Sequence, residues 1–191
     1  MARTLGPLTL PSTCTAALGD AYFLPNAPRE YRSGVHQGAD FMCRRTGETA
    51  VAALPGRVVM AHSGWTEPTF GDRQSLLDQA AVLGRTPDST LTLLYGRHVV
   101  LDHGLIPDVG HVVTVSAHLD SIDPAVVLGT MVEAGQPIGV IGASGTSEAS
   151  DGSNDTSDHH LHWELYVDDQ YLGAGLNGAE TVELYQLLLG L

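Results

Sequence analysis

The sequence predicts a mainly β domain with two helical additions. Residues 160–166 alternate between polar and apolar side chains, which is the period-two pattern of a strand with one face on a core. Turn signals such as Leu54-Pro55-Gly56 separate other short apolar runs, and 22 Gly and 10 Pro fit many turns and short strands. The length of 191 residues suits one domain with insertions, and a hydrophobic content of 43% suffices for its core.

The first 62 residues are expected to run from an extended lead-in into the sheet. Residues 1–30 are rich in Pro and Gly and show little periodicity, which favours an extended segment. Glycines within residues 31–41 argue against a helix, so His36 and Asp40 are expected on a loop that enters a strand. Residues 49–62 are expected to form two short strands around the Pro-Gly turn.

A helical insertion is expected at residues 64–90. Helix-forming residues at 72–83 place apolar side chains at helical spacing, and Gly84 provides a stop. Strand patterns return in three further segments: 91–102, 111–119 and 131–141.

The last part of the chain combines a polar loop, the alternating strand and a helix. Residues 143–158 are a low-complexity polar segment, expected to be a mobile loop. Its acidic residues do not have the spacing of an EF-hand calcium loop, which favours a solvated loop. Residues 179–191 have apolar side chains at helical spacing and are expected to dock on the domain as a helix. We therefore divide the chain into an extended segment (1–30), a domain (31–172) and a packed C-terminal helix (173–191).

The charge of the chain excludes several classes of partner. The formal net charge is −13, with only 9 Lys and Arg. Because neutralising phosphates requires basic side chains, DNA, RNA and anionic lipid surfaces are not expected partners. A cationic substrate is compatible with this charge, although solubility explains it as well.

The two cysteines and the absence of long apolar runs bear on the compartment. Cys14 and Cys43 could form one disulfide that ties the N-terminal segment to the domain, but the sequence does not give their distance. Neither belongs to a C-x-x-C pattern, which argues against a redox or Cys-rich zinc site. No run reaches the ~18–20 apolar residues of a membrane helix, and the first residues do not resemble a signal peptide.

Two segments supply candidate metal ligands. On a strand, His160 and His162 lie side by side on one face, where both could bind a metal or one could lie beside it. His36 and Asp40 add an imidazole and a carboxylate, which are both good zinc ligands. Three protein ligands and one water are the pattern of a catalytic zinc site. His118, at the end of a predicted strand, is a candidate for proton transfer.

Four segments occur in a fixed order along the chain: 36–40 (HQGAD), 116–119 (SAHL), 132–139 (VEAGQPIG) and 160–164 (HLHWE). Together they resemble a known family, the LytM/lysostaphin-type zinc metallopeptidases, many of which cut peptide cross-links in bacterial cell walls. The resemblance covers roughly residues 31–172.

The resemblance implies a role for each matching residue. It implies that His36, Asp40 and His162 bind Zn²⁺, and that the catalytic residues His118 and His160 flank the attacking water without binding the metal. It also implies the antiparallel β-sheet hybrid-motif fold of these peptidases. Which of the two catalytic histidines is the base is left open. The helical insertion and the polar loop are longer than the family's compact connections, and both are candidates for lining the substrate groove.

Several other residues have two competing interpretations. Glu164 shares the face of the ligands and could hold a histidine in place, or it could be an ordinary solvated or strand-pairing Glu. Tyr31 could donate to the oxyanion, but an exposed aromatic at the start of a strand is the favoured interpretation. His159 receives no role. Structural or surface roles are favoured for the remaining histidines: His62, His98, His103 and His111.

The function implied by the resemblance is that of a zinc metalloendopeptidase. Its substrate would be a peptide, above all a stem or cross-link of bacterial peptidoglycan, and its location would be extracellular or periplasmic. The oligomeric state is left open.

Three other functions compete with it. A non-catalytic module of the same fold could bind cell wall or regulate a partner hydrolase, although all five motif residues are present. A phosphocarrier or lipoyl-type carrier would share the turn at residues 132–139, but no Lys lies in the motif segments. A Ser-His-Asp hydrolase is disfavoured because no G-x-S-x-G motif is present.

Overall fold

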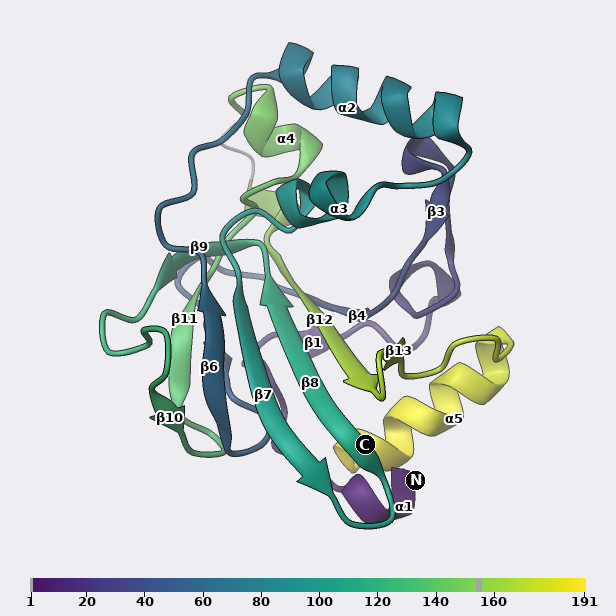
Figure 1. Ribbon diagram of the computed structural model, residues 1–191, viewed down its shortest axis with the longest axis vertical. Helices are drawn as coiled ribbons and strands as arrows, with labels where there is room; N and C mark the ends of the chain where they lie inside the picture. Colours follow the sequence, from purple (N-terminus) through teal and green to yellow (C-terminus); the bar gives the residue numbers. More distant parts are fainter. Residues whose placement is uncertain (1, 154–155) are drawn as a thin grey trace.

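The computed structural model describes residues 2–153 and 156–191, and it confirms the mainly β fold with antiparallel sheets. The largest sheet has eight strands, all paired antiparallel (Figure 1). Seven lie in the order β1 (Thr15–Ala16), β4 (Ala39–Met42), β12 (His160–Val167), β8 (Gly110–Ala117), β7 (Val99–Ile106), β6 (Gly56–Ala61) and β10 (Met131–Val132). The eighth strand, β13 (Gln170–Tyr171), pairs with β12.

Two smaller sheets complete the β structure of the described residues. Both are antiparallel, and they consist of β5 (Thr49–Val51), β11 (Pro137–Ile141) and β9 (Leu119–Ile122) in one, and β2 (Pro28–Arg29) and β3 (Gly34–Val35) in the other. β8 belongs to the large sheet and β9 to the three-stranded sheet, so the chain changes sheets at the single residue between them, His118.

One hydrophobic core fixes the orientation of β12. Leu161, Trp163 and Leu165 are at most 1% exposed, as the alternation predicts. Phe41 of β4 packs edge-to-face on Trp163, with ring centroids 6.4 Å apart. Burying a large apolar side chain stabilises the fold by roughly 1.5–3 kcal/mol. The intervening polar residues of β12 must therefore face the other side of the sheet.

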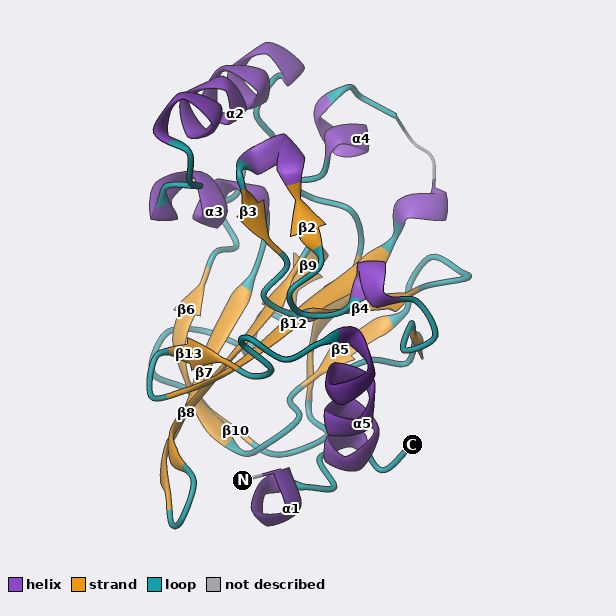
Figure 2. Ribbon diagram, turned by 90° about the vertical axis from the view of Figure 1, so that its right-hand side faces the viewer, coloured by secondary structure: helices purple, strands orange, loops and turns teal. Residues whose placement is uncertain are grey.

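Helices gather at two opposite ends of the molecule (Figures 1 and 2). At one end lie α2 (Phe70–Leu83), α3 (Asp88–Leu94) and α4 (Ser147–Ser150); at the other lie α1 (Ala2–Leu5) and α5 (Gly178–Leu189), close to the two chain termini. Within the described ranges, no helix has both the length and the apolar character needed to cross a membrane.

Local signals explain where the longer helices begin and end. The side chain of Thr69 accepts a hydrogen bond from the backbone N–H of Asp72 at the start of α2, and Gly84 ends this helix with φ of 65°. Asn177 and Glu180 form a capping box at the start of α5. The helices expected at 72–83 and 179–191 thus correspond to α2 and α5.

Three segments differ from the sequence-based expectations. Residues 91–94, expected to begin a strand, belong to α3, because a four-residue apolar run does not distinguish strand from helix. Residues 1–30 are not simply extended: besides α1, β1 and β2 they contain the 3-10 helix η1 (Ala21–Phe23). The polar loop at 143–158 contains α4 and the 3-10 helix η3 (Thr156–Asp158), while its residues 154 and 155 lie outside the described part.

A disulfide joins Cys14 to Cys43 and closes a loop with a sequence separation of 29 residues. Cys14 directly precedes β1 and Cys43 directly follows β4, and these two strands pair. The bond therefore fastens the N-terminal segment to the strand that carries Asp40.

Replacing both cysteines by Ala should lower the free energy of unfolding by about 3–4 kcal/mol, because the unfolded chain regains the entropy of a loop of this length. Denaturant unfolding of the double variant measures this difference. The wild-type protein in excess reductant is the control and should unfold at the same denaturant concentration as the variant. Equal stability of the oxidised protein and the variant would contradict the prediction.

Candidate metal centre

The pairing of β4 with β12 brings the expected ligands together. In this ladder Asp40 lies directly opposite His162, and their side chains point to the same face of the sheet. His36 comes from the short connection between β3 and β4. Gly38 lets this connection approach β12, since a Cβ at this position would lie 2.4 Å from the backbone oxygen of Trp163.

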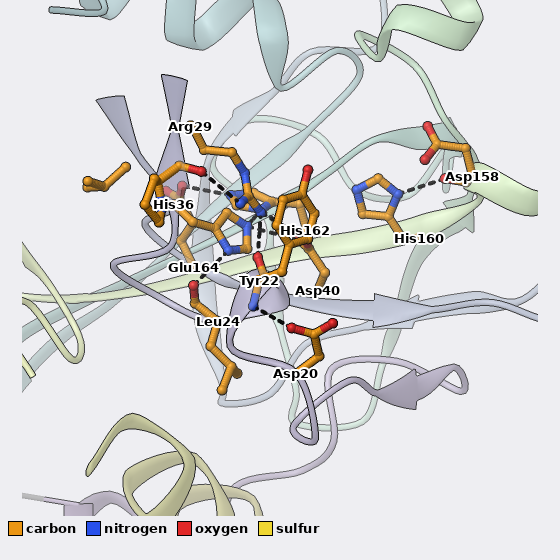
Figure 3. A network of polar contacts seen from close by, with 12 residues as sticks. Asp20, Tyr22, Leu24, Arg29, His36, Asp40, Asp158, His160, His162 and Glu164 are labelled. Carbon is orange, nitrogen blue, oxygen red and sulfur yellow. Dashed lines mark hydrogen bonds and ion pairs between the residues drawn. The ribbon is translucent and has the colours of Figure 1, made fainter. Parts of the chain in front are cut away.

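Three ligand atoms from these residues form a buried triangle (Figure 3). His36 Nε2 lies 2.8 Å from His162 Nδ1 and 3.1 Å from Asp40 Oδ1. His162 Nδ1 lies 3.0 Å from the same carboxylate oxygen. All three residues are at most 7% exposed.

Hydrogen bonds on the far side of each ring determine which nitrogen of the neutral imidazole faces the triangle without a proton. His36 Nδ1 donates to the backbone oxygen of Leu24 (3.1 Å), and His162 Nε2 donates to Glu164 (2.8 Å). In the neutral imidazoles, His36 Nε2 and His162 Nδ1 therefore carry lone pairs that face each other and a carboxylate. Such a set of donors repels itself unless a cation lies between them, so it fits a metal ion.

The protonation equilibria of the triangle reflect its burial and close contacts. Burial lowers the pKa of His36, an effect that Asp40 partly opposes. Burial alone would raise the pKa of Asp40, but the neighbouring His36 and His162 hold it well below its usual range, so the carboxylate is ionised. Burial also disfavours the charged form of His162, yet its hydrogen bonds to Asp40 and Glu164 raise its pKa to about 9. Without a metal, the site thus holds a proton where a cation would bind.

Glu164 supports His162 from behind. It is 1% exposed, and its second oxygen accepts hydrogen bonds from the hydroxyls of Tyr95 (2.7 Å) and Tyr166 (2.8 Å). Burial would raise the pKa of Glu164, but the hydrogen bonds from His162 and the two tyrosines lower it. Of its two interpretations from the sequence, the structure thus has Glu164 hold a histidine rather than lie in solvent. An ionised acceptor here fixes the ring of His162 and makes Nδ1 its metal-facing atom.

His118 and His160 lie beside the triangle, with ring centroids 4.7 Å apart. The Nδ1 of His118 donates to the backbone oxygen of Ser144 (2.8 Å), and that of His160 to the backbone oxygen of Asp158 (2.7 Å). Both imidazoles therefore keep Nε2 as the free acceptor when neutral. Burial, together with the charges of His160 and His162, holds the pKa of His118 well below its usual range.

The backbone of His118 is in the left-handed region, with φ of 59°. Its N–H donates to the backbone oxygen of Tyr95 (2.9 Å), and its C=O accepts from Gly142 (2.9 Å). These bonds hold a conformation that is uncommon outside glycine and that Asn, Asp and His adopt most readily among the others. The expected strand over 111–119 is therefore two strands, β8 and β9, with His118 at the turn between them.

A cavity of about 470 Å³ opens over these five residues. His36, Asp40, His118, His160 and His162 all line it. Its other walls come from the N-terminal segment, from α2 and α3 of the insertion, and from residues 145–148 of the polar loop. The two long segments that the sequence suggested as groove walls thus both border the cavity.

Sequence reasoning missed the groups that hold the site in place. Arg29 lines the cavity, and its Nη2 lies 3.6 Å from Asp40 Oδ2 and donates to the backbone oxygen of Tyr22 (2.8 Å). Tyr95 lies within residues 91–102, whose apolar pattern predicts a strand. Nothing in that pattern indicates a hydrogen bond from Tyr95 to a residue of the site.

The remaining candidates lie elsewhere or have other contacts. Tyr31 borders the cavity but is 52% exposed, with the Arg73 guanidinium 5.9 Å from its ring centroid. Five histidines do not line the cavity: His62, His98, His103, His111 and His159. The first four are those for which structural or surface roles are expected, and His159 has no predicted role.

With this geometry in hand, comparison with known proteins identifies the class. Residues 34–174 match the profile of peptidase family M23, and the chain belongs to this family. The matched region contains all five residues described above. No curated protein matches the chain.

Several solved structures resemble the chain at low identity. A zinc-containing peptidase from Vibrio cholerae is 22% identical (TM-score 0.43), over 72% of this chain and 29% of its own. Csd3 from Helicobacter pylori is 17% identical (TM-score 0.47), over 86% and 33%. The catalytic domain of the antimicrobial peptidase lysostaphin from Staphylococcus simulans is 23% identical (TM-score 0.45), over 78% and 79%. The chain thus spans about a third of the length of the first two.

Replacing Gly38 by Ala should weaken zinc binding, because the new Cβ would push the His36–Asp40 connection away from β12. Overpacking of this kind should also lower the free energy of unfolding by about 1–3 kcal/mol. Zinc affinity by chelator competition and denaturant unfolding measure the two effects. The matched control is Gly64→Ala, since a Cβ at Gly64 meets nothing within 4 Å. Identical zinc affinity in the two variants would refute this explanation of Gly38.

Replacing Glu164 by Gln should weaken zinc binding roughly 10- to 100-fold, because an amide is a weaker acceptor for His162 than a carboxylate. The size of the side chain is preserved, so the zinc-free variant should still fold. Its melting temperature, measured without zinc, separates a loss of zinc affinity from a loss of structure. The exposed Glu133 provides the control substitution Glu133→Gln. An unchanged zinc affinity in Glu164→Gln would show that Glu164 does not support the metal site.

Proposed function

We propose that the chain is a zinc metalloendopeptidase that hydrolyses peptide bonds in bacterial cell-wall peptidoglycan. The observation that carries this proposal is the arrangement of five residues at one cavity. Two imidazole lone pairs and a carboxylate converge there, and two further imidazoles with free Nε2 atoms lie alongside. In this proposal His36, Asp40 and His162 hold Zn²⁺, and His118 and His160 are the catalytic residues.

The chain's own groups would perform the proton transfers. When bound, zinc would polarise the scissile carbonyl and make the attacking water more acidic. His118 or His160 would accept the proton of that water at Nε2 and return it to the leaving amine, as a positioned imidazole can. The carbonyls of Ser144 and Asp158 keep the proton on each Nδ1, so Nε2 stays available for this exchange. The second histidine, in its protonated form with a proton on Nε2 as well as Nδ1, would donate to the oxyanion.

The cell wall as substrate and a location outside the cytoplasm are parts of the same proposal. A disulfide between Cys14 and Cys43 fits an oxidising compartment, since such bonds rarely persist in the cytosol. A peptidoglycan peptide would reach the site from the open side of the cavity, beside α2 and residues 145–148. A non-catalytic module of this fold is the alternative, and the metal and activity measurements below separate the two.

Substitutions should divide the five residues into two groups. His36→Ala and Asp40→Ala should lose both zinc and hydrolysis of peptidoglycan, because each removes a proposed ligand. His118→Asn and His160→Ala should keep zinc and lose about 10²- to 10⁴-fold in kcat/KM, the usual contribution of general acid–base catalysis. Asn suits position 118 because it tolerates the left-handed backbone.

Metal analysis and release of free amines from peptidoglycan, with and without chelator, measure these effects. His111→Ala, outside the cavity, is the control and should retain both properties. Loss of zinc from His118→Asn would place His118 among the ligands. Bound zinc without hydrolysis in the wild-type protein would favour the non-catalytic module.

A further inference from the structure

The cavity gathers a third of the arginines of this protein. The chain carries a formal net charge of −13, and all nine of its basic side chains are arginines. Arg29, Arg32 and Arg73 line the same cavity as the triangle of proposed ligand atoms described above. Each of these arginines is at most 8% exposed. Burying a guanidinium is costly unless an anion compensates for it. The partners of these three arginines therefore indicate what the cavity is built to bind.

Arg29 forms an ion pair within the protein, whereas Arg32 and Arg73 form none among the described residues. Arg29 lies 3.6 Å from the carboxylate of Asp40. Arg32 donates only to neutral acceptors, the hydroxyl of Thr86 and the backbone oxygen of Val35. Among the described residues no carboxylate lies within 4 Å of Arg32 or Arg73.

Of these two arginines, Arg73 has fewer hydrogen-bond acceptors for its guanidinium. Its Nε is buried without a hydrogen-bond partner, and no hydrogen bond to its guanidinium is found within residues 2–153 and 156–191. The Cζ atom of its guanidinium lies 5.9 Å from the ring centroid of Tyr31. Glu148 and Asp158 also line the cavity, but neither carboxylate lies within 4 Å of the Arg73 guanidinium. Burial raises the pKa of Glu148, whereas its hydrogen bonds and the charge of Arg73 lower it, so Arg73 interacts with Glu148 at a distance. A buried cation with free donors is a binding group for an anion.

The insertion is built to hold the two arginines together. Arg73 lies in the first turns of α2, which packs against the 3-10 helix η2 (Glu30–Arg32). Thr86, just beyond α2, donates its hydroxyl to the backbone oxygen of Arg32 (2.6 Å) and accepts from the Arg32 guanidinium (3.1 Å). Arg32 and Arg73 therefore face one cavity from two elements that are fastened to each other.

We propose that Arg32 and Arg73 form a subsite for a carboxylate of the substrate peptide. The forked guanidinium matches the two oxygens of a carboxylate, and the deep location of both side chains strengthens the interaction by excluding water. The proposal rests on the proposed peptidase function and narrows its substrate class to peptides with a free carboxylate near the cleaved bond. An entirely neutral peptide, such as a glycine bridge, would leave this subsite without its ligand.

Binding of two forms of one probe tests the subsite independently of hydrolysis. The probe is a set of soluble peptidoglycan fragments, either native or with their carboxylates converted to amides. Both forms are titrated by calorimetry into zinc-loaded His118→Asn protein, in which fragments are expected to bind without being cut. Native fragments should bind roughly tenfold more tightly than amidated ones, since a charged hydrogen bond is lost on amidation.

Adding Arg73→Gln should remove this difference. It should weaken binding of native fragments roughly tenfold and leave the affinity for amidated fragments nearly unchanged, as expected for two groups that interact directly. Arg73→Lys should restore part of the affinity. The matched control is Arg85→Gln, an exposed arginine just after α2 that does not line the cavity. Arg73 has no hydrogen bond to lose, so the melting temperature should change little.

The outcomes separate this proposal from the peptidase proposal. Equal affinity for native and amidated fragments, or equal losses for both in Arg73→Gln, would overturn the carboxylate subsite. Binding that depends on both the carboxylate and Arg73 would support it, even if the wild-type protein failed to hydrolyse any fragment. Absence of hydrolysis by the wild-type protein would contradict the proposed peptidase function but not the carboxylate subsite.

Discussion

The antiparallel ladder between β4 and β12 is the constraint on which the site depends. Asp40 and His162 face each other across it, while their neighbours Phe41 and Trp163 turn to the opposite face and pack together in the core. A shift of the pairing by one residue would turn the apolar set away from the core and the polar set into it. The free energy of the core therefore maintains the register that positions two of the three proposed ligand groups. The triangle of His36, Asp40 and His162 therefore needs no additional interaction to align its two strands.

Each histidine of the site is oriented by an acceptor on its far side. Backbone oxygens of Leu24, Ser144 and Asp158 hold three of the rings, and the carboxylate of Glu164 holds the fourth. Leu24 and Ser144 lie 12 and 26 residues from the histidines they hold, so the tautomers of His36 and His118 depend on the completed fold. Asp158 and Glu164 lie only two residues from His160 and His162. Catalytic groups fixed in this way lose little entropy when they act, which is the physical basis of a preorganised site.

Periodicity was sufficient to predict the part of the site that lies on β12, because strand geometry alone puts His160, His162 and Glu164 on one face. It could not predict Arg29 or Tyr95, whose contribution comes from contacts between segments far apart in the sequence. The same limit explains α3, since four apolar residues fit a helix or a strand equally well until their neighbours are known. The left-handed backbone of His118 was likewise invisible, because it follows from the change of sheet at that residue.

The two ends of the chain lie beside α1 and α5, at the end of the molecule opposite α2 and α4 (Figure 1). The cavity is bordered by α2 and by residues that lead into α4, whereas no residue of α1 or α5 lines it. A tag, a linker or an immobilising anchor attached beside α1 or α5 would leave the walls of the cavity untouched. The proposed substrate is an insoluble polymer. Because α1 and α5 lie away from the cavity, a molecule tethered beside them could still bind the surface of that polymer with its cavity.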